Sequence, residues 1–265
     1  VSKQKDSIVV KKGNSIDVVK YEDFTVEGTL AEYVKDVVAY EGDSLLSNVS
    51  ADNALSYSTD TLGKHTIEFA VTDAIGNVAK ADNSYTVFCK TDRKGVAFDG
   101  ETPVSMVFDV HEKPLALVGI TDADKVEYSS SDKSVAVIDD EGLVYPVGVG
   151  NATIKATVQE TEGYFETYAE YEIEVSKGDG KDYVSFVHDV NFDVPENLTY
   201  GETFENPVFF DKTANHNAVV TYTSSNEGVA SVDGNGTVTA VSVSNTAAII
   251  TAKVTELTNL TDAEL

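Results

Sequence analysis

The sequence contains a single cysteine, Cys89, so the chain cannot form an intramolecular disulfide. This excludes the class of small secreted domains that several disulfides hold together. The sequence also lacks any run of about 18 apolar residues, the length that a membrane-spanning helix needs. Its first residues, Val1–Ser7, lack the apolar core of a signal peptide.

Basic residues are scarce. The chain has 19 Lys and Arg against 45 Asp and Glu, which gives a formal net charge of −26. A surface this negative repels phosphate backbones and anionic lipid headgroups. We therefore expect neither nucleic acid nor a membrane surface as a partner. Hydrophobic residues still make up 42% of the chain, which is enough to build packed cores.

Motifs of hydrolytic enzymes are absent. The sequence has no G-x-S-x-G, and the segment HEKPL at His111 lacks the second histidine of H-E-x-x-H. The four histidines are also far apart along the chain: His65, His111, His188 and His216. We predict that the chain is not an enzyme, has no catalytic residues and needs no cofactor.

Strand-like alternation dominates what is present. In the segment HTIEFAVTD, apolar residues face one side and polar residues the other: Ile67, Phe69 and Val71 against Thr66, Glu68 and Thr72. Clusters of Gly, Asn, Asp and Ser interrupt such runs every 8 to 12 residues or so, a spacing typical of β-sandwiches. The segment 29–40, TLAEYVKDVVAY, fits a short amphipathic helix or a strand equally well. The pattern predicts an all-β fold.

Two distant stretches repeat each other: VEYSSSDKSVAVI at 126–138 and VTYTSSNEGVASV at 220–232. The alignment continues to the pair Ile154 and Ile250 after two extra residues in the second stretch, which indicates an internal repeat of domain length. Residues 136 and 138, with 230 and 232, are apolar in both copies and should face a core. The segments DDEG and DGNG predict hairpin turns, and the serines should bond backbone groups beside them.

These repeated residues resemble a known family. The segments YSSSDKSVAVIDDEGLVYPVGVGNATIKATV and YTSSNEGVASVDGNGTVTAVSVSNTAAIITAKV are similar to the bacterial immunoglobulin-like domains of group 2, over residues of about 95–177 and 181–265. Gly150, before the last matched strand, is replaced by Asn245 in the second copy. The segment LGKHTIEFAVTDAIGNVAKADNSYTV resembles another bacterial Ig-like type, and this resemblance implies such a domain over residues of about 1–91. Its Asp-x-x-Gly-Asn turn suits a hairpin with Gly76 in the left-handed region.

The resemblance predicts three tandem immunoglobulin-like β-sandwich domains in an elongated arrangement, at residues 1–91, 92–177 and 178–265. Boundaries fall in the polar segments CKTDRKG and SKGDGKD, which are too short for independent tumbling and should allow limited bending. The terminal TDAEL aligns with TYAEY, where the closing strand of the middle domain begins. We therefore expect the last copy to stop as its final strand begins, and the natural protein to continue beyond Leu265.

Acidic turns raise the possibility of calcium, because hard cations bind several oxygen ligands. The candidate groups are Asp73 with Asn77, Asp122 with Asp124, and Asp139, Asp140 and Glu141. None has the ligand spacing of a dedicated calcium loop, so turn formation and a solvated surface are the favoured interpretation. If an ion binds, the Asp73 turn or an interdomain boundary is the expected place.

The segment GYFETYAEY carries aromatic residues that could stack on sugar rings: Tyr164, Phe165, Tyr168 and Tyr171. Core packing explains most of them, and the absence of Trp lowers the case for a sugar platform. Cys89 ends the apolar run YTVFC, and we predict that it is a small buried hydrophobic residue.

The resemblance implies an exported bacterial protein at the cell surface, outside the cell. The predicted role is a stalk or spacer, or adhesion, with an unknown protein or glycan as the partner and a monomeric chain. One alternative is a binding module for carbohydrate or host protein. The other is a set of accessory domains in a larger secreted enzyme that degrades polysaccharide.

Overall fold

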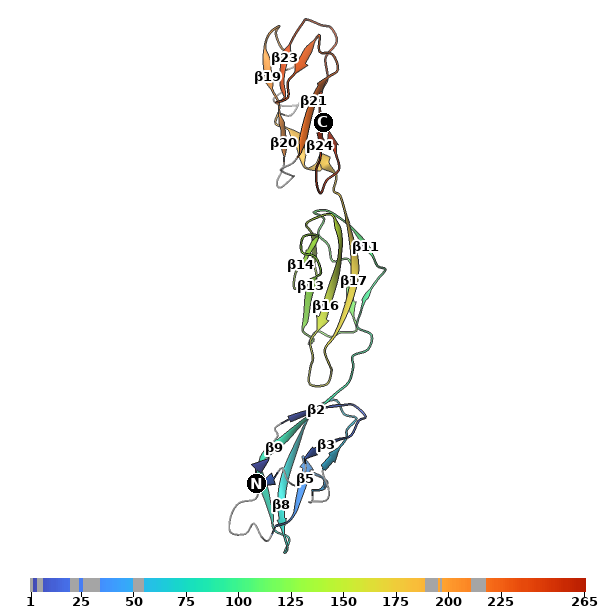
Figure 1. Ribbon diagram of the computed structural model, residues 1–265, viewed down its shortest axis with the longest axis vertical. Helices are drawn as coiled ribbons and strands as arrows, with labels where there is room; N and C mark the ends of the chain where they lie inside the picture. The colour runs from blue at the N-terminus through green and yellow to red at the C-terminus, as the bar shows by residue number, and fades with distance from the viewer. Residues whose placement is uncertain are drawn as a thin grey trace. The chain divides into compact units, whose positions relative to one another are not determined.

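A computed structural model describes residues 2–3, 7–19, 24–25, 34–49, 55–188, 195, 197–210 and 218–265 (Figure 1). Within these ranges the secondary structure consists of β-strands and one 3₁₀ turn, η3 (Gly180–Asp182), with no α-helix. No helix long and apolar enough to cross a membrane is found in the described residues. The predicted all-β fold is confirmed.

The chain forms two compact units. One contains residues 1–98, 117–127 and 156–169, and the other contains residues 99–116, 128–155 and 170–265. Every sheet nevertheless takes all its strands from a single predicted domain, within residues 2–90, 97–176 or 184–264. The domain boundaries and the elongated arrangement stay predictions.

The main sheet of the N-terminal segment (residues 1–91) has the order β2-β9-β8-β5-β6. Its strands are β2 (Ser7–Lys11), β5 (Val34–Glu41), β6 (Ser44–Val49), β8 (Gly63–Asp73) and β9 (Val78–Lys90). A second pair joins β3 (Ile16–Val19) to β7 (Leu55–Tyr57), and a third joins β1 (Ser2–Lys3) to β4 (Phe24–Thr25). The segment 29–40 is thus a strand from Val34 onward, and its earlier residues lie outside the described ranges.

Strand β8 shows the predicted alternation with one exception. Ile67, Phe69 and Val71 are buried, as expected, whereas Glu68 is exposed. Ala70, on the opposite side of the strand from Phe69 and Val71, is buried too. The pairing of β8 with β9 is irregular here, because the two-residue step from Glu68 to Ala70 lies opposite the four-residue step from Ser84 to Lys80.

The middle copy (residues 92–177) has a four-stranded sheet of order β11-β17-β16-β13, visible in Figure 1. Its strands are β11 (Val104–Val107), β13 (Val126–Ser130), β16 (Gly150–Val158) and β17 (Thr167–Ser176). Two further pairs are β14 (Ala136–Ile138) with β15 (Val144–Pro146), and β10 (Ala97–Asp99) with β12 (Ala116–Val118). Alternate residues of β16 and β17 are buried, so one face of this sheet covers a core.

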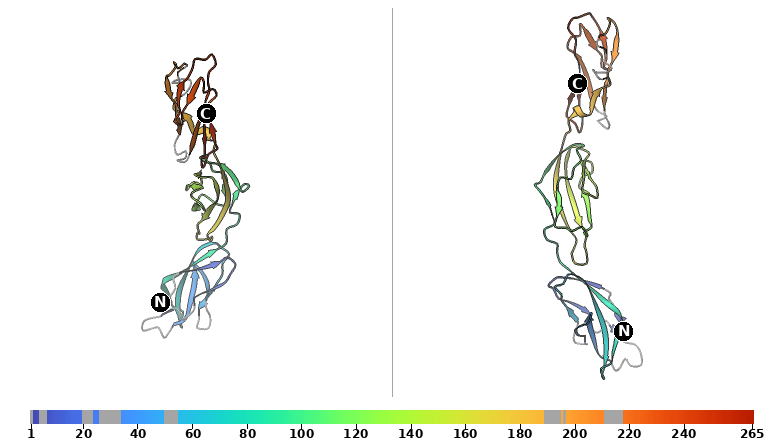
Figure 2. Two further views of the ribbon diagram at one scale, coloured as in Figure 1. Left: turned by 45° about the horizontal axis from the view of Figure 1, so that its top comes forward. Right: turned by 180° about the vertical axis from the view of Figure 1, so that it is seen from behind.

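The C-terminal copy (residues 178–265) has two three-stranded sheets, β19-β23-β22 and β21-β24-β25, and the pair β18-β20. Its strands are β18 (Val184–Phe186), β19 (Thr203–Glu205), β20 (Val208–Phe210), β21 (Val219–Ser224), β22 (Ala230–Val232), β23 (Thr237–Ala240), β24 (Ile250–Thr255) and β25 (Ala263–Glu264). Figure 2 shows these strands from two further directions.

The strands of the two aligned stretches correspond, which agrees with the predicted repeat: β13, β14, β15 and β16 of the middle copy match β21, β22, β23 and β24 of the C-terminal copy. Tyr128 lies in β13 and Tyr222 in β21. Ala136 is fully buried and Val137 is 41% exposed, which confirms the inward face of β14. All three residues of β22 are only half-buried, which differs from the expectation. Of these three residues, Ala230 lines a cavity of about 700 Å³ in the C-terminal copy.

The serine clusters bond backbone groups beside the strands, as predicted. Ser131 Oγ accepts the N–H of Thr153 at 2.8 Å, and Ser225 Oγ accepts the N–H of Ile249 at the same distance. Asp132, which closes the first cluster, accepts the N–H of Ser134 at 2.8 Å. These side chains satisfy backbone donors where the chain leaves one sheet for the other.

Candidate functional site

The first candidate, Asp73, is the opening residue of the turn between β8 and β9. Its carboxylate accepts the N–H of Ile75 at 3.0 Å and of Asn77 at 2.8 Å, and the side-chain amide of Asn77 at 2.7 Å. These bonds, the Asn77 side chain first, lower the pKa of Asp73 because they favour the charged form. Gly76 has φ of 89°, which confirms the predicted left-handed position.

Asp139 opens an equivalent turn between β14 and β15. Its carboxylate accepts the N–H of Glu141 at 3.0 Å and of Leu143 at 2.8 Å, and the hydroxyl of Tyr145 at 2.9 Å. The Leu143 N–H is the main cause of a lowered pKa at Asp139. Gly142 takes φ of 82°, in the region that glycine tolerates best.

A third copy of the turn begins at Asp233, whose carboxylate accepts the N–H groups of Asn235 and Thr237, both at 2.9 Å. The hairpin turns predicted from DDEG and DGNG are therefore confirmed. In all three turns the opening carboxylate bonds the backbone two and four residues ahead. These three Asp side chains therefore stabilise hairpin turns by accepting backbone hydrogen bonds.

The other acidic candidates differ in how exposed they are and in what they contact. Asp122, Asp140 and Glu141 are exposed, whereas the Asp124 side chain is only 5% exposed and forms an ion pair with Arg93. Within the described residues, no group of three or more His, Cys, Asp or Glu side chains could hold a metal ion. Calcium binding at these residues stays a prediction.

The aromatic candidates meet the polar segment CKTDRKG, which we call the first linker (residues 89–95). Tyr164 is 37% exposed, and the Arg93 guanidinium carbon lies 4.6 Å from the centre of its ring. The N–H of Phe165 donates to the carbonyl oxygen of Thr91 at 3.1 Å. Tyr168 lies on β17 and is 56% exposed. A sugar-binding role for these three residues stays a prediction.

The first linker forms a short bridge to the loop between β16 and β17. The N–H of Thr91 donates to the carbonyl oxygen of Gly163 at 3.0 Å, and the carbonyl oxygen of Thr91 accepts the N–H of Phe165. Thr91 thereby forms an isolated parallel bridge with Tyr164.

The second linker (residues 176–182, SKGDGKD) makes the same bridge to the loop between β24 and β25. The N–H of Gly178 donates to the carbonyl oxygen of Asn259 at 3.0 Å, and the N–H of Thr261 donates back to Gly178 at 2.9 Å. Gly178 and Leu260 form the corresponding parallel bridge. The loop before the last strand of each copy is thus bonded to the linker that precedes that copy.

Different side chains surround the two bridges. At the first linker, Arg93 and Asp124 form a doubly hydrogen-bonded ion pair whose side chains are 7% and 5% exposed. Lys90 Nζ also lies 2.9 Å from a carboxylate oxygen of Glu160. Sequence reasoning missed both ion pairs, because their partners are distant in the chain and follow no local spacing.

The second linker is bounded by apolar side chains. Leu257 and Leu260 are 1% and 2% exposed, and Lys177 Nζ donates to the carbonyl oxygen of Leu257 at 2.9 Å. Gly180 lies so close to the backbone that a Cβ there would be 2.1 Å from the carbonyl oxygen of Thr261. This linker therefore depends on close packing in place of a buried ion pair.

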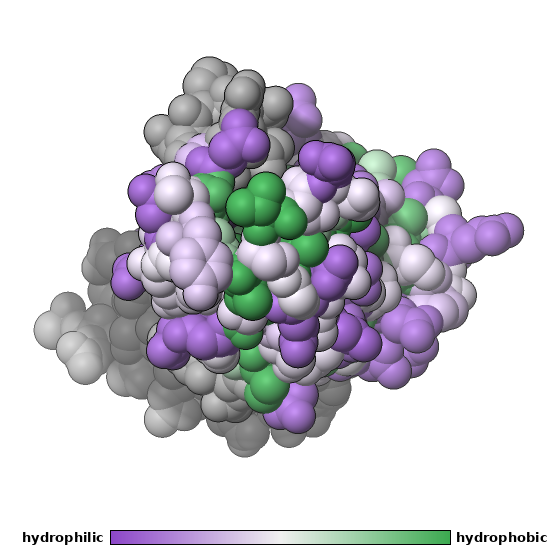
Figure 3. Space-filling view, turned by 90° about the horizontal axis from the view of Figure 1, so that it is seen from above, coloured by the Kyte–Doolittle hydropathy of each residue, from purple (hydrophilic) through white to green (hydrophobic). Residues whose placement is uncertain are grey.

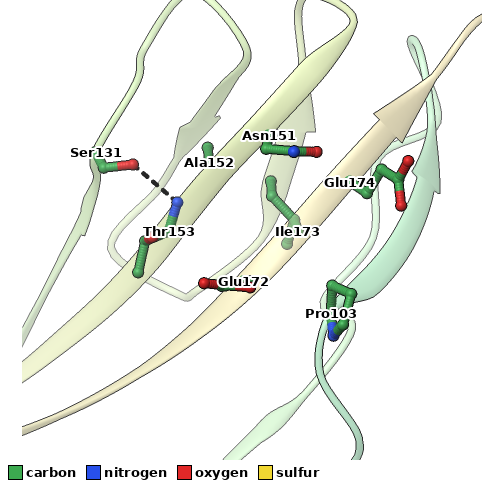
Figure 4. A pocket seen from close by; sticks show the side chains of 8 residues that line it. All are labelled: Pro103, Ser131, Asn151, Ala152, Thr153, Glu172, Ile173 and Glu174. Atoms are coloured by element: carbon green, nitrogen blue, oxygen red, sulfur yellow. Dashed lines mark hydrogen bonds between the residues drawn. The ribbon is translucent and has the colours of Figure 1, made fainter.

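A polar pocket of about 220 Å³ lies at the β16 and β17 strands of the middle copy (Figure 4). Glu172 and Glu174 project from β17, and Asn151 and Thr153 lie on β16 (Figure 4). Pro103 forms part of its lining. Carboxylate and amide groups can hydrogen-bond a hydroxyl-rich ligand, so this pocket is a candidate binding site that the sequence did not indicate.

Three of the four histidines, His65, His111 and His188, lie in the described residues. His65 is 8% exposed, and its Nδ1 lies 2.5 Å from a carboxylate oxygen of Glu41. His111 and His188 belong to the other compact unit, and His216 lies outside the described residues.

Cys89 is fully buried in β9, and its Sγ lies 3.4 Å from the carbonyl oxygen of Thr59. Burial raises the pKa of the thiol. The prediction of a small buried hydrophobic residue is confirmed, and a raised pKa disfavours the reactive thiolate.

Similarity to solved structures is weak. The fibronectin(III)-like modules of Clostridium thermocellum CbhA are 15% identical, with 64% of this chain and 90% of that chain covered and a TM-score of 0.32. Drosophila N-cadherin EC1-3 is 11% identical, with 99% and 96% covered and a TM-score of 0.30. Human CDH23 EC21-23 is 12% identical, with 97% and 96% covered and a TM-score of 0.29. At these scores the similarities assign no function to this chain.

No match was found among curated proteins. The family described as bacterial Ig-like domain (group 2) matches twice, at residues 102–167 and 199–261, and no catalytic domain was identified. Such domains are typical of bacterial surface and secreted proteins and of enzyme-accessory modules. The resemblance seen in the repeated stretches is thereby confirmed, while the type of the N-terminal domain stays a prediction. The chain contains two tandem bacterial Ig-like domains of group 2, one in the middle copy and one in the C-terminal copy.

Proposed function

We propose that this chain is a non-catalytic stalk or spacer segment of an exported bacterial protein, located outside the cell at its surface. The observation that carries the proposal is the repeated bridge, in which Thr91 and Gly178 make the same pair of backbone hydrogen bonds to the following copy. A spacer extends reach only if its joints resist bending. A linker bonded to the next domain has fewer accessible conformations than a free one.

Relaxation of backbone amide nuclei in solution tests the stalk proposal. If the linkers restrain the domains, amides of the N-terminal segment, the middle copy and the C-terminal copy should report one shared slow tumbling time. Three separate, faster tumbling times would mean independent domains and would overturn the proposal. A chain with several Gly-Ser repeats inserted between Lys90 and Thr91 is the matched control, because it separates the N-terminal segment from the residues that form the bridge, and its N-terminal segment should tumble faster.

An adhesive role is the second candidate, and the pocket at β16 and β17 favours it. In this role the chain is monomeric and binds a glycan or a protein at the cell surface. The carboxylates of Glu172 and Glu174, with the amide of Asn151, offer acceptors and donors suited to sugar hydroxyls.

A glycan array probed with the whole chain tests this role. The expected result is retention of a defined set of glycans that is lost in Asn151→Ala and Glu172→Ala. The control variant Glu170→Ala changes an exposed residue of the same strand that does not line the pocket. Equal retention by all variants would exclude the pocket as the binding site.

A further inference from the structure

Hydrophilic side chains normally lie at the protein surface, as they do on the face seen in Figure 3, where they are drawn in purple. His65 is an exception. It lies on β8 in the N-terminal segment and is 8% exposed, and its ring centre is 5.9 Å from that of Tyr57. A buried polar group needs a partner for each of its polar atoms, so the contacts of His65 indicate which protons it carries.

Both ring nitrogens of His65 face acceptors. Nδ1 lies 2.5 Å from a carboxylate oxygen of Glu41, and Nε2 lies 2.8 Å from the carbonyl oxygen of Thr61. A neutral imidazole has one N–H and can donate to only one of these acceptors. The pair of His65 and Glu41 therefore holds a second proton, in the bond between them. Histidine is the stronger base of the two residue types, so this proton lies on Nδ1 and the ring is an imidazolium.

The groups around this pair come from several elements. The other carboxylate oxygen of Glu41 accepts the hydroxyl of Tyr57, on β7, at 2.9 Å. Burial first, and then this hydrogen bond, raise the pKa of Tyr57, so it stays a neutral donor. Burial also raises the pKa of Cys89, on β9, where the exposed charges of Asp60 and Lys12 act with opposite signs. Rising pH therefore acts on the histidine proton and leaves Tyr57 and Cys89 unchanged.

Loss of this proton breaks the hydrogen bond to Thr61. The one N–H that remains on His65 can donate to Glu41 or to Thr61, but not to both. A hydrogen bond to a charged acceptor is about twice as strong as one to a neutral acceptor. The N–H therefore stays with the carboxylate of Glu41, and a lone pair of Nε2 is left facing the carbonyl oxygen of Thr61, which repels it.

Thr61 belongs to a short loop, residues 58–62, that reaches the first linker. The next residue, Leu62, packs against the core of the N-terminal segment. A Cβ on Gly163 would lie 3.2 Å from the Cβ of Leu62, so the two residues are in close contact. Gly163 in turn accepts the N–H of Thr91 at 3.0 Å, in the bridge described above. The bond to His65 therefore helps to hold the loop beside this bridge.

We propose that His65, Glu41 and Thr61 form a pH-sensitive clasp at the first linker. With the proton bound, the clasp holds the loop 58–62 against Gly163. When rising pH removes the proton, the loop is released and the N-terminal segment moves more freely relative to the middle copy. Rising pH favours release, because the held loop binds a proton that the released loop does not need. The effect on movement rests on the proposed stalk function, whereas the clasp itself does not.

Nitrogen-15 NMR of the histidine rings in the whole chain tests the clasp. Long-range proton–nitrogen spectra distinguish an imidazolium from each neutral tautomer. We expect His65 to carry hydrogen on both nitrogens at about pH 5.5 and on Nδ1 alone at about pH 8.5. The amide signals of Thr61 and Gly163 should shift with the same midpoint as the ring. The tumbling time of the N-terminal segment should match that of the middle copy at the lower pH and become shorter at the higher pH.

Glu41→Gln is the informative variant. Its side-chain amide can donate to Nδ1, so a neutral His65 keeps its hydrogen on Nε2 and its bond to Thr61 as the pH rises. The pH-dependent shifts of the Thr61 and Gly163 signals should then be lost. Glu68→Gln is the matched control, because it removes the same charge from an exposed position of β8 and should leave these shifts as they are in the original chain.

Two results would disprove the clasp: hydrogen on Nε2 of His65 at about pH 8.5 in the original chain, or a Thr61 signal that does not follow the ring. A Gly163 signal that stays fixed while Thr61 responds would disprove the connection to the linker. Independent tumbling of the N-terminal segment at both pH values would contradict the stalk proposal. The ring spectra do not depend on tumbling, so failure of the clasp and failure of the stalk are distinguishable.

Discussion

The two linkers share a backbone pattern and differ in the side chains around it. Thr91 and Gly178 make equivalent hydrogen bonds to the next copy. The buried pair of Arg93 and Asp124 lies beside the first bridge, whereas the second is covered by apolar side chains such as Leu260. The backbone bridge is therefore the same at both linkers. The side chains around each bridge determine how its stability responds to pH, salt and substitution.

The largest expected effect is at the first linker. Arg93→Ala leaves Asp124 buried without its cation, and we expect the free energy of unfolding to fall by about 3 kcal/mol. Urea denaturation followed by circular dichroism measures it. Asp92→Ala is the matched control, because it removes the exposed pair with Lys11 and should cost less than about 0.5 kcal/mol. Similar losses in both variants would show that the buried pair is not special.

Close packing should dominate at the second linker. Gly180→Ala places a Cβ 2.1 Å from the carbonyl oxygen of Thr261, and the backbone must shift to relieve the overlap. We expect a loss of about 2 kcal/mol in the free energy of unfolding, measured in the same way. Gly234→Ala is the control, since its Cβ would meet nothing within 4 Å. A stable Gly180→Ala protein would contradict the close contact.

The pH response should separate the joints further. The N–H of Thr121 and the Arg93 guanidinium lower the pKa of Asp124 in the folded chain. The pair therefore stabilises the fold above the pKa of an unfolded Asp, about 3.9, and this stability is lost as the pH falls through the lowered folded value. Asp124→Asn should lose less stability than the original chain between pH 7 and pH 3. Identical pH dependence in urea denaturation would argue against this.

The smallest expected effect is at the rim of the first linker. Glu160→Ala removes the partner of Lys90, but the Glu160 side chain is 65% exposed. We expect a loss of about 0.5 kcal/mol at low salt that shrinks toward zero at about 1 M salt, because water and ions screen exposed charges. Denaturation at two salt concentrations measures it. A loss as large as that of Arg93→Ala would mean that the two pairs act as one network.

Local patterns predicted much of the fold. The alternation at Ile67, Phe69 and Val71 marked a strand and its buried face, and the aligned stretches at Tyr128 and Tyr222 marked a repeated unit. The acidic hairpin turns also followed from sequence, because an Asp carboxylate bonds backbone groups two and four residues ahead. These features depend on neighbours along the chain, so the order of residues is enough to predict them.

Contacts between distant residues were not predictable in the same way. No spacing links Arg93 to Asp124, and nothing in the sequence placed Tyr164 against that arginine. The burial of Ala70 was missed as well, because it depends on what packs over the strand and not on the alternation within it.

The sequence by itself determined the all-β character, the repeat and the hairpins, because backbone preferences and alternating polarity depend on residues that are close together in the chain. Only the tertiary structure decided how deeply each apolar side chain is buried and which distant residues meet. Ala136 and Ala230 occupy the same position in the repeat, yet one is fully buried and the other is half-buried. Burial depends on the residues that pack over a side chain, and those are brought together by the assembled sheets and not by neighbours along the chain.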